Sequence, residues 1–303
     1  MNADAQAIQT SQLPSEVKGI LDRGEPSHIA IISPDGPVLT YRDLKHQVGL
    51  LSKQLHSFGI GRGDRVAIVL PNGVEHIVSF LAVTAAGATA APLNPAFTKE
   101  ELRFCLEDAN AKAFISSPAE SKAVRAALQD SIISIAVGTD SDGQVCFTSS
   151  NNEIEPRPAE PSDADDVALV LHTSGTTSRP KRVPLTHQNL LVSAQNIVET
   201  YALTADDVSL CVMPLFHIHG LVASTLATLI SGGVVVVPTR FNAMDFWQTV
   251  EAHDVTWYSA VPTMHQALLH RAKRSTGSQA IEISSRNLRF IRSCSAPFTP
   301  EVL

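Results

Sequence analysis

Apolar and polar residues alternate along the chain in blocks, and the period of each block predicts a strand or a helix. The N-terminal part gives a weak helical signal at 15–23 and a short strand at 28–33. A clear amphipathic helix follows Thr40, which has the position and chemistry of a helix N-cap. The apolar residues of this helix step by three or four positions: Tyr41, Leu44, Val48, Leu51, Leu55 and Phe58.

The same alternation continues through the rest of the chain. Apolar runs predict strands at 65–70, 88–93, 112–116, 132–137, 167–171, 208–213, 234–237, 255–259 and 288–294. Helical patterns lie between them at 74–86, 99–109, 119–129, 187–201, 220–231, 243–253 and 262–274. Strands that alternate with helices of roughly ten or more residues are typical of βαβ units. The pattern therefore predicts an α/β fold with parallel sheets.

A polar, acidic stretch at 138–166 interrupts this alternation. It holds three prolines within six residues (Pro156, Pro158, Pro161), and we interpret it as a connector. We therefore expect two α/β subdomains, residues 1–160 with the connector and residues 161–303. Thr299, Pro300 and Glu301 have the pattern of a helix start just before the sequence stops, so we expect the second subdomain to be incomplete.

Composition narrows the class of protein. The 303 residues are 44% hydrophobic and 17% charged, enough for a large buried core. The apolar runs are too short or too interrupted to span a bilayer, and the first twelve residues lack the pattern of a secretory signal. The four cysteines have no C-x-x-C spacing, which predicts reduced, mostly buried thiols. A net charge of −7 argues against nucleic-acid partners. We expect a cytoplasmic protein, or a peroxisomal one if a C-terminal signal lies beyond this sequence.

The segment after the predicted strand at 167–171 has the chemistry of a phosphate site. Its hydroxyl and backbone N–H groups can donate to phosphate oxygens, and its one glycine allows close approach. Lys181 adds a mobile positive charge between Arg179 and Arg182. The single glycine excludes the G-x-x-x-x-G-K-[ST] loop. The small and hydroxylated residues are Thr173, Ser174, Gly175, Thr176, Thr177 and Ser178. A solvated turn with a basic patch explains the same composition, so both interpretations stay open.

Two further segments follow predicted strands, where ligands of α/β proteins bind. His217, in Pro214–Gly220, is a candidate donor, gate or general base, although a histidine that satisfies backbone carbonyls is the alternative. Zinc ligation by His217 and His219 lacks a closed ligand spacing, so we predict no metal site. The small residues of Ser293–Pro297 allow a flat ring to pack, and an ordinary strand-to-helix turn is the alternative.

Residues 173–181, T-S-G-T-T-S-R-P-K, resemble the phosphate-loop signature of the acyl-adenylate-forming superfamily, [ST]-S-G-[ST]-T-G-x-P-K-G. This superfamily contains acyl-CoA synthetases, luciferases and peptide-synthetase adenylation domains. Ser178 and Arg182 stand where glycines are usual. A glycine at the second position can adopt positive φ, which Arg182 would resist. The segments P-x-F-H-x-x-G at 214–220 and Ser-Ala-Pro at 295–297 are also similar to the superfamily. The S-R-P-K variant and the I-R-S-C-S-A segment resemble its oxalate–CoA ligase branch.

This resemblance implies the large N-terminal domain of such an enzyme, built from two packed α/β sheets. It implies that a carboxylate and MgATP give an acyl-adenylate and pyrophosphate, and that CoA then forms a thioester. In that reaction Lys181 and the residues 173–178 hold the ATP phosphates, and Lys181 acts electrostatically. Ser295, Ala296 and Pro297 lie near the nucleotide, and His217, Ser293 and Ser295 lie near the carboxylate.

The expected ligands are therefore ATP, Mg²⁺, CoA and a small carboxylate, with oxalate first. A medium-chain or aryl acid is the alternative within the same class. A non-catalytic nucleotide-binding fragment is the alternative from another class, because the superfamily carries further motifs beyond the point where this sequence stops.

Overall fold

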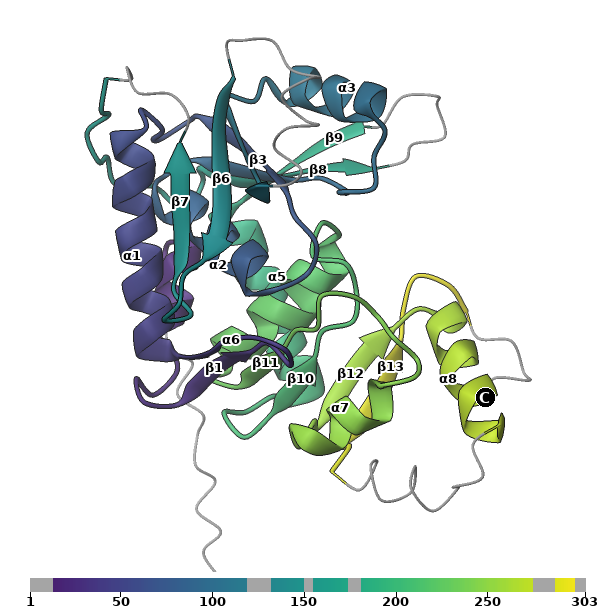
Figure 1. Ribbon diagram of the computed structural model, residues 1–303. Coiled ribbons are helices and arrows are strands. Elements are labelled where there is room, and N and C mark those ends of the chain that lie inside the picture. Colours follow the sequence, from purple (N-terminus) through teal and green to yellow (C-terminus); the bar gives the residue numbers. More distant parts are fainter. Residues whose placement is uncertain (1–12, 119–131, 150–154, 174–180, 275–286, 298–303) are drawn as a thin grey trace, which may run out of the picture.

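The computed structural model describes residues 13–118, 132–149, 155–173, 181–274 and 287–297 (Figure 1). The helix expected at 119–129 and the helix start at 299–301 lie outside these ranges. So do five residues of the predicted phosphate loop: Ser174, Gly175, Thr176, Thr177 and Ser178.

The described strands form two mixed sheets. The first sheet has the order β7-β6-β5-β3-β4-β8-β9 and the second has the order β13-β12-β10-β11-β1-β2. Pairing is parallel inside both sheets and antiparallel only at β7, β9 and β2. The strands of the first sheet are β3 (Arg65–Val69), β4 (Thr89–Pro92), β5 (Ala113–Ser116), β6 (Ile133–Thr139), β7 (Val145–Ser149), β8 (Val167–Thr173) and β9 (Lys181–Thr186). Those of the second are β1 (Ile29–Ile32), β2 (Val38–Thr40), β10 (Val208–Leu210), β11 (Val234–Val236), β12 (Trp257–Ala260) and β13 (Phe290–Ser293). The predicted α/β class with two packed sheets is confirmed.

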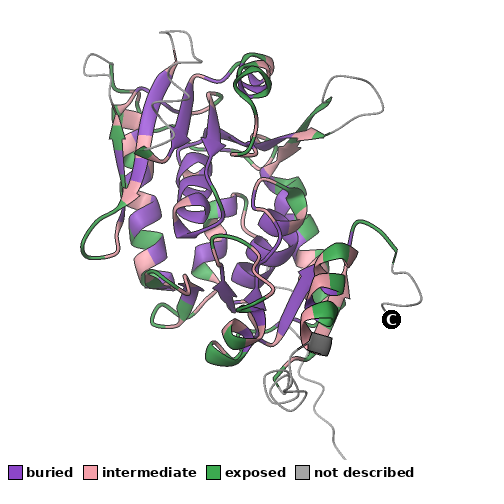
Figure 2. Ribbon diagram, turned by 45° about the vertical axis from the view of Figure 1, so that its right-hand side comes forward, coloured by how far each residue is buried: buried purple, intermediate pink, exposed green. Residues whose placement is uncertain are grey.

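Helices cover both faces of each sheet, as largely parallel sheets require (Figures 1 and 2). The helices α2 (Val74–Ala85) and α5 (His187–Tyr201) lie between the sheets with the π-helix η2 (His219–Leu226) and α6 (Ala227–Ile230). Helix α1 (Tyr41–Ser57) packs beside α2, and α3 (Lys99–Ala109) covers the outer face of the first sheet. Helices α7 (Phe246–Ala252) and α8 (Pro262–Arg274) cover the outer face of the second.

Strand alternation decides which residues enter which core. Val66 and Ile68 of β3 point into the large core between the sheets, whereas Ala67 and Val69 point toward α3. Trp257 of β12 likewise faces the inner core, and Tyr258 faces α7 and α8. The inner layer of helices is therefore shared by both sheets and joins them.

Capping fixes the starts of the helices. The Thr40 and Thr186 side chains accept hydrogen bonds from the backbone N–H groups of Asp43 and Asn189, as in a capping box. The Thr40 cap was predicted from the residue type and position. The limits of α3, α5 and α8 agree with the predicted ranges.

Several expectations were wrong. The predicted connector contains a strand, β7, because Val145–Ser149 pairs in antiparallel register with β6. Strands β2 and β9 were also unexpected, and the helix predicted at 220–231 begins as the π-helix η2. The N-terminal helix is a short 3₁₀ segment, η1 (Val17–Asp22).

The sheets interleave across the predicted division of the chain at residue 160. Strands β1 and β2, from the N-terminal part, complete the second sheet. Strands β8 and β9, from the C-terminal part, close the edge of the first. The division into two subdomains at this point stays a prediction. In the described part of the chain, no helix is both long and apolar enough to cross a membrane.

Candidate functional site

The segments that follow two parallel strands, one from each sheet, are in direct contact. Asn72 follows β3 of the first sheet, and its side chain bonds the backbone of the loop after β10 of the second. Its Nδ2 donates to Met213 O at 2.9 Å, and its Oδ1 accepts from Leu215 N at 2.8 Å. Ligands of open α/β sheets bind beyond the carboxyl ends of the strands. The candidate site therefore lies where these two edges face each other.

The β8–β9 hairpin, here called the hairpin arm, carries the described ends of the predicted phosphate loop. Thr173 lies opposite Lys181 in the antiparallel ladder, and its hydroxyl donates to Lys181 O at 3.3 Å. Both residues are exposed. Within the described part of the chain the Lys181 ammonium forms no ion pair, so its charge is available to an anion.

Arg182, which stands in place of a usual glycine, does not strain the backbone. It lies in extended conformation in β9 opposite His172, so the expected conflict with positive φ is absent. Its guanidinium donates to the carbonyl oxygen of Asp108, and His172 Nε2 lies 3.1 Å from Asp108 Oδ2. Asp108 is in the last turn of α3, where the helix dipole favours a positive charge. Arg182 and His172 therefore attach the hairpin arm to α3.

The second group of residues, here called the loop arm, comprises residues 213–219, Ser259 and Arg292. The ring of His217 packs against Phe216 with centroids 4.6 Å apart, and partial burial lowers its pKa. His219, to which no role was assigned, has Nε2 2.8 Å from Ser259 Oγ. Burial, with a smaller contribution from the Arg292 charge, lowers the pKa of His219 to about 4. His219 is therefore neutral at physiological pH.

Arg292 supplies the positive charge of the loop arm. Its Nη1 lies 3.5 Å from His219 Nε2, and its guanidinium lies over the Tyr201 ring, 5.5 Å from the centroid. Among the residues that the structure describes, no carboxylate pairs with it. A half-buried guanidinium without a counter-ion is a candidate for binding an anionic ligand.

Ser293 lies on the opposite face of the strand from Arg292. The register pairs Ser259 with Arg292 and Ala260 with Ser293, and successive side chains alternate between faces. Ser293 Oγ is buried and has no hydrogen-bond partner in the described part of the protein. Arg292 is therefore the residue of this segment that shares a face with His219.

The turn after β13 holds the three residues predicted to line the nucleotide site. Ser295, Ala296 and Pro297 are all exposed. Ser295 has φ of 68°, a left-handed conformation that is rare for a residue with a side chain and is often found at functional sites. The described residues form no hydrogen bond or ion pair between this turn and Lys181 or His217.

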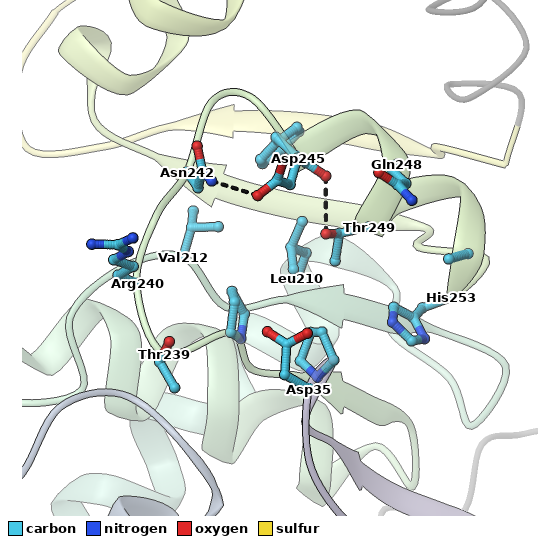
Figure 3. Close-up of a pocket in the computed structure, with 14 residues that line it drawn as sticks. Asp35, Leu210, Val212, Thr239, Arg240, Asn242, Asp245, Gln248, Thr249 and His253 are labelled. Atoms are coloured by element: carbon cyan, nitrogen blue, oxygen red, sulfur yellow. Dashed lines mark hydrogen bonds between the residues drawn. The ribbon is translucent and has the colours of Figure 1, made fainter.

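A pocket of about 430 Å³ lies elsewhere, beside α7 on the outer face of the second sheet (Figure 3). Leu210 and Val212 form its floor, and Thr239, Arg240 and Asp245 line its sides. None of the predicted site residues that the structure describes lines it. All four cysteines are free, and three of them are buried as expected. Across the described ranges, no three His, Cys, Asp or Glu side chains gather as a metal site would require.

Sequence signals account for only part of this site. The hairpin arm was found because its hydroxyl and cationic side chains are contiguous in the sequence. Asn72, His219, Ser259 and Arg292 were missed as a group, because 141 to 143 residues separate Asn72 from its partners and 73 separate His219 from Arg292. The apolar strand ends before Ser259 and Arg292 were the available signal.

Comparison with models of protein families matches residues 22–303 to a family described as AMP-binding enzyme. The chain is 43% identical over 272 residues to a probable CoA ligase of Humulus lupulus, which covers 88% of this chain and 51% of that protein. It is 42% identical over 259 residues to an oxalate–CoA ligase of Arabidopsis thaliana, covering 83% of this chain and 49% of that protein. The crystal structure of apo MatB from Rhodopseudomonas palustris has a TM-score of 0.78 and 27% identity, and the match covers 95% of this chain and 56% of that one. The chain thus spans about half the length of the relatives it matches.

Proposed function

The chain belongs to the family of AMP-binding enzymes, and on that premise we propose that the complete protein is an acid–CoA ligase. The observation that carries this proposal is a pair of cations that have no carboxylate partner among the described residues: the exposed Lys181 on the hairpin arm, and the half-buried Arg292 beside the neutral His219 on the loop arm. In the proposed reaction a carboxylate oxygen attacks the α-phosphorus of ATP, and pyrophosphate leaves. The CoA thiolate then attacks the acyl carbon, and AMP leaves with the electron pair of the broken C–O bond.

In this proposal the hairpin arm binds the nucleotide phosphates. Lys181 stabilises the charge that develops on the leaving pyrophosphate, together with Thr173 and the loop residues 174–178. Mg²⁺ would supply charge neutralisation for the phosphates when ATP is bound. The described part of this arm offers hydroxyls and cations to the phosphates, and the nearby Asp108 carboxylate is already engaged by His172. Ser295, Ala296 and Pro297 provide an exposed turn against which the adenine packs.

The loop arm binds the carboxylic acid in this proposal, and oxalate is the first candidate. Oxalate keeps a second negative charge next to the reacting carboxylate, and Arg292 offers a guanidinium with no other counter-ion in the described part. Neutral His219 and the Ser259 hydroxyl supply hydrogen bonds without a further charge. His217 and Ser295 stay candidates on the side of the reacting carboxylate, whereas the predicted Ser293 lies on the face of β13 opposite to Arg292. The 42% identity to an oxalate–CoA ligase supports the same choice.

The test is acid-dependent ATP–pyrophosphate exchange by the complete protein. We expect exchange with oxalate and much less with its monomethyl ester, which has the same carbon skeleton around the reacting carboxylate but lacks the second charge. A panel of medium-chain and aryl acids tests the alternative substrates. Preference for one of these acids would replace oxalate, and the absence of exchange with every acid would contradict the ligase proposal.

A further inference from the structure

The turn after β3 is held in place by a histidine of helix α2. His76, in the first turn of α2, has Nδ1 3.2 Å from Leu70 O and 3.3 Å from Pro71 O. Since both partners are carbonyl oxygens, Nδ1 carries the proton and donates. Burial lowers the pKa of His76 to about 4, so the ring is neutral and this arrangement persists at physiological pH. Hydrogen bonds from His76 therefore fix the backbone of the turn that contains Asn72.

Asn72 bonds the loop of the opposite sheet through both ends of its carboxamide. The Asn72 residue is 9% exposed, and its two bonds to Met213 O and Leu215 N are 2.9 and 2.8 Å long. A carbonyl on one side and an N–H on the other fix which end is nitrogen and which is oxygen. Removing this side chain would leave the buried Leu215 N–H unpaired and would leave Met213 O with only the weak Cys211 thiol donor at 3.7 Å, which is more costly than the loss of an exposed hydrogen bond.

The same loop is confined on its other side by Gly220. A Cβ atom at Gly220 would lie 2.4 Å from Pro214 O and 2.6 Å from Met213 O, so the π-helix η2 packs directly on the loop backbone. The loop is thus clamped between Asn72 and Gly220. It leads directly into His217, whose N–H donates to Pro214 O at 3.1 Å.

We infer that Asn72 is a positioning residue for the loop arm, an inference that rests on the proposed function. It belongs to the first sheet, yet its contacts fix the loop that carries His217 and leads to His219. Its loss should displace the acid-binding groups and leave the hairpin arm, which binds the phosphates, in place. The expected defect is therefore selective for the acid.

The experiment compares Asn72→Ala with wild type in the complete protein. We expect kcat/KM for oxalate in ATP–pyrophosphate exchange to fall roughly ten- to a hundredfold, the scale of lost buried hydrogen bonds and a displaced reacting group. The Kd for ATP should stay within about twofold, since no contact to the hairpin arm is lost. The control is Asn94→Ala, the same residue type in the turn after β4, whose Oδ1 accepts only from the nearby Ala96 N–H at 2.9 Å. Asn94→Ala should leave both constants unchanged.

Hydrogen exchange provides a readout that does not depend on catalysis. The Leu215 amide, which donates to Asn72, should lose at least roughly tenfold of its protection in Asn72→Ala. If the wild type activates no acid, the proposed function fails, and this measurement still tests the contact. If Asn72→Ala does not fold, Asn72→Ser is tested in its place. This smaller change should again lower kcat/KM for oxalate more than it weakens ATP binding, with a weaker effect. Equal losses toward ATP and oxalate, or unchanged protection of Leu215, would overturn the inference.

Discussion

The hairpin arm and the loop arm each carry a cation that has no carboxylate partner among the described residues, but the two arms are built in opposite ways. Strand β9 is exposed over Lys181–Pro184, and only one register position, Ala90 with Leu169, joins the hairpin to the rest of its sheet. The loop arm follows the buried residues Cys211 and Val212, begins at the buried Met213, and is held on both sides by Asn72 and Gly220. The charged groups of the hairpin arm are exposed to water, whereas those of the loop arm lie next to the packed interior.

This difference matches what each proposed ligand requires. A triphosphate carries several charges and its own magnesium, so hydrated lysine and hydroxyl groups at the surface suffice to bind it. A small diacid has few atoms, so its discrimination depends on partly desolvated donors with fixed positions. We therefore expect changes in the hairpin arm to act on ATP and changes in the loop arm to act on the acid.

The largest expected effect comes from Lys181→Ala. Removing the charge should slow adenylate formation by the complete protein roughly ten- to a thousandfold, the scale of losing one preorganised electrostatic contact. ATP–pyrophosphate exchange at saturating oxalate measures it. Lys53→Ala, which removes an exposed lysine of α1, is the control and should have no effect. An unchanged exchange rate in Lys181→Ala would remove the lysine from the mechanism.

Acid should destabilise the support of the loop arm. His76 has a pKa near 6.5 when unfolded and about 4 when folded, so between these values the unfolded chain binds more protons. The stabilisation is complete above pH 6.5 and decreases as the pH falls, by about 3 kcal/mol at pH 4. Urea unfolding at pH 7 and pH 4.5 measures this contribution. His76→Asn, which keeps a donor but cannot be protonated, should lose less stability, and identical pH profiles would contradict the assignment.

Arg292→Gln tests whether the loop arm recognises the second charge of the acid. We expect kcat/KM for oxalate to fall roughly a hundredfold, near the upper range for a charge-assisted hydrogen bond. Activity with the monomethyl ester should change much less. Arg289→Gln is the contrast, because Arg289 pairs with Asp207 at 3.0 Å and should affect stability instead. An equal loss with oxalate and its ester would show that Arg292 does not bind the second carboxylate.

The smallest effect should come from Arg182→Gly, which restores the usual glycine. Arg182 bonds the Asp108 carbonyl and has no strained backbone. The substitution should therefore raise KM for ATP roughly fivefold, which corresponds to the loss of about one hydrogen bond. His172→Asn, which weakens the second attachment to α3, should act on the same constant. A loss beyond a hundredfold would make Arg182 a phosphate contact, and a gain would show that it strains the loop.

The two arms also differ in how far the sequence predicts them. The α/β class, the limits of α3 and α5, and the threonine caps follow from local periodicity and side-chain chemistry. Strands β2, β7 and β9 do not, because each is an antiparallel edge strand with exposed positions and therefore lacks the continuous apolar run that marks the buried strands. The hairpin arm could be recognised because its residues are contiguous. The contact of His219 with Ser259 and Arg292 depends on the order β13-β12-β10, which no local pattern contains.

The exchange of strands between the two halves has a consequence for how the chain folds. The second sheet needs residues 29–40 and also β13 at residues 290–293, so it stays unfinished until nearly all of this sequence has been synthesised. The first sheet likewise cannot be completed before β8 and β9 have been synthesised. During synthesis, the β1–β2 pair must remain without its other partner, β11, while the first sheet assembles, and unpaired strand edges promote aggregation. A nascent chain of this topology therefore has to be kept from aggregating for longer than one whose two halves fold in succession.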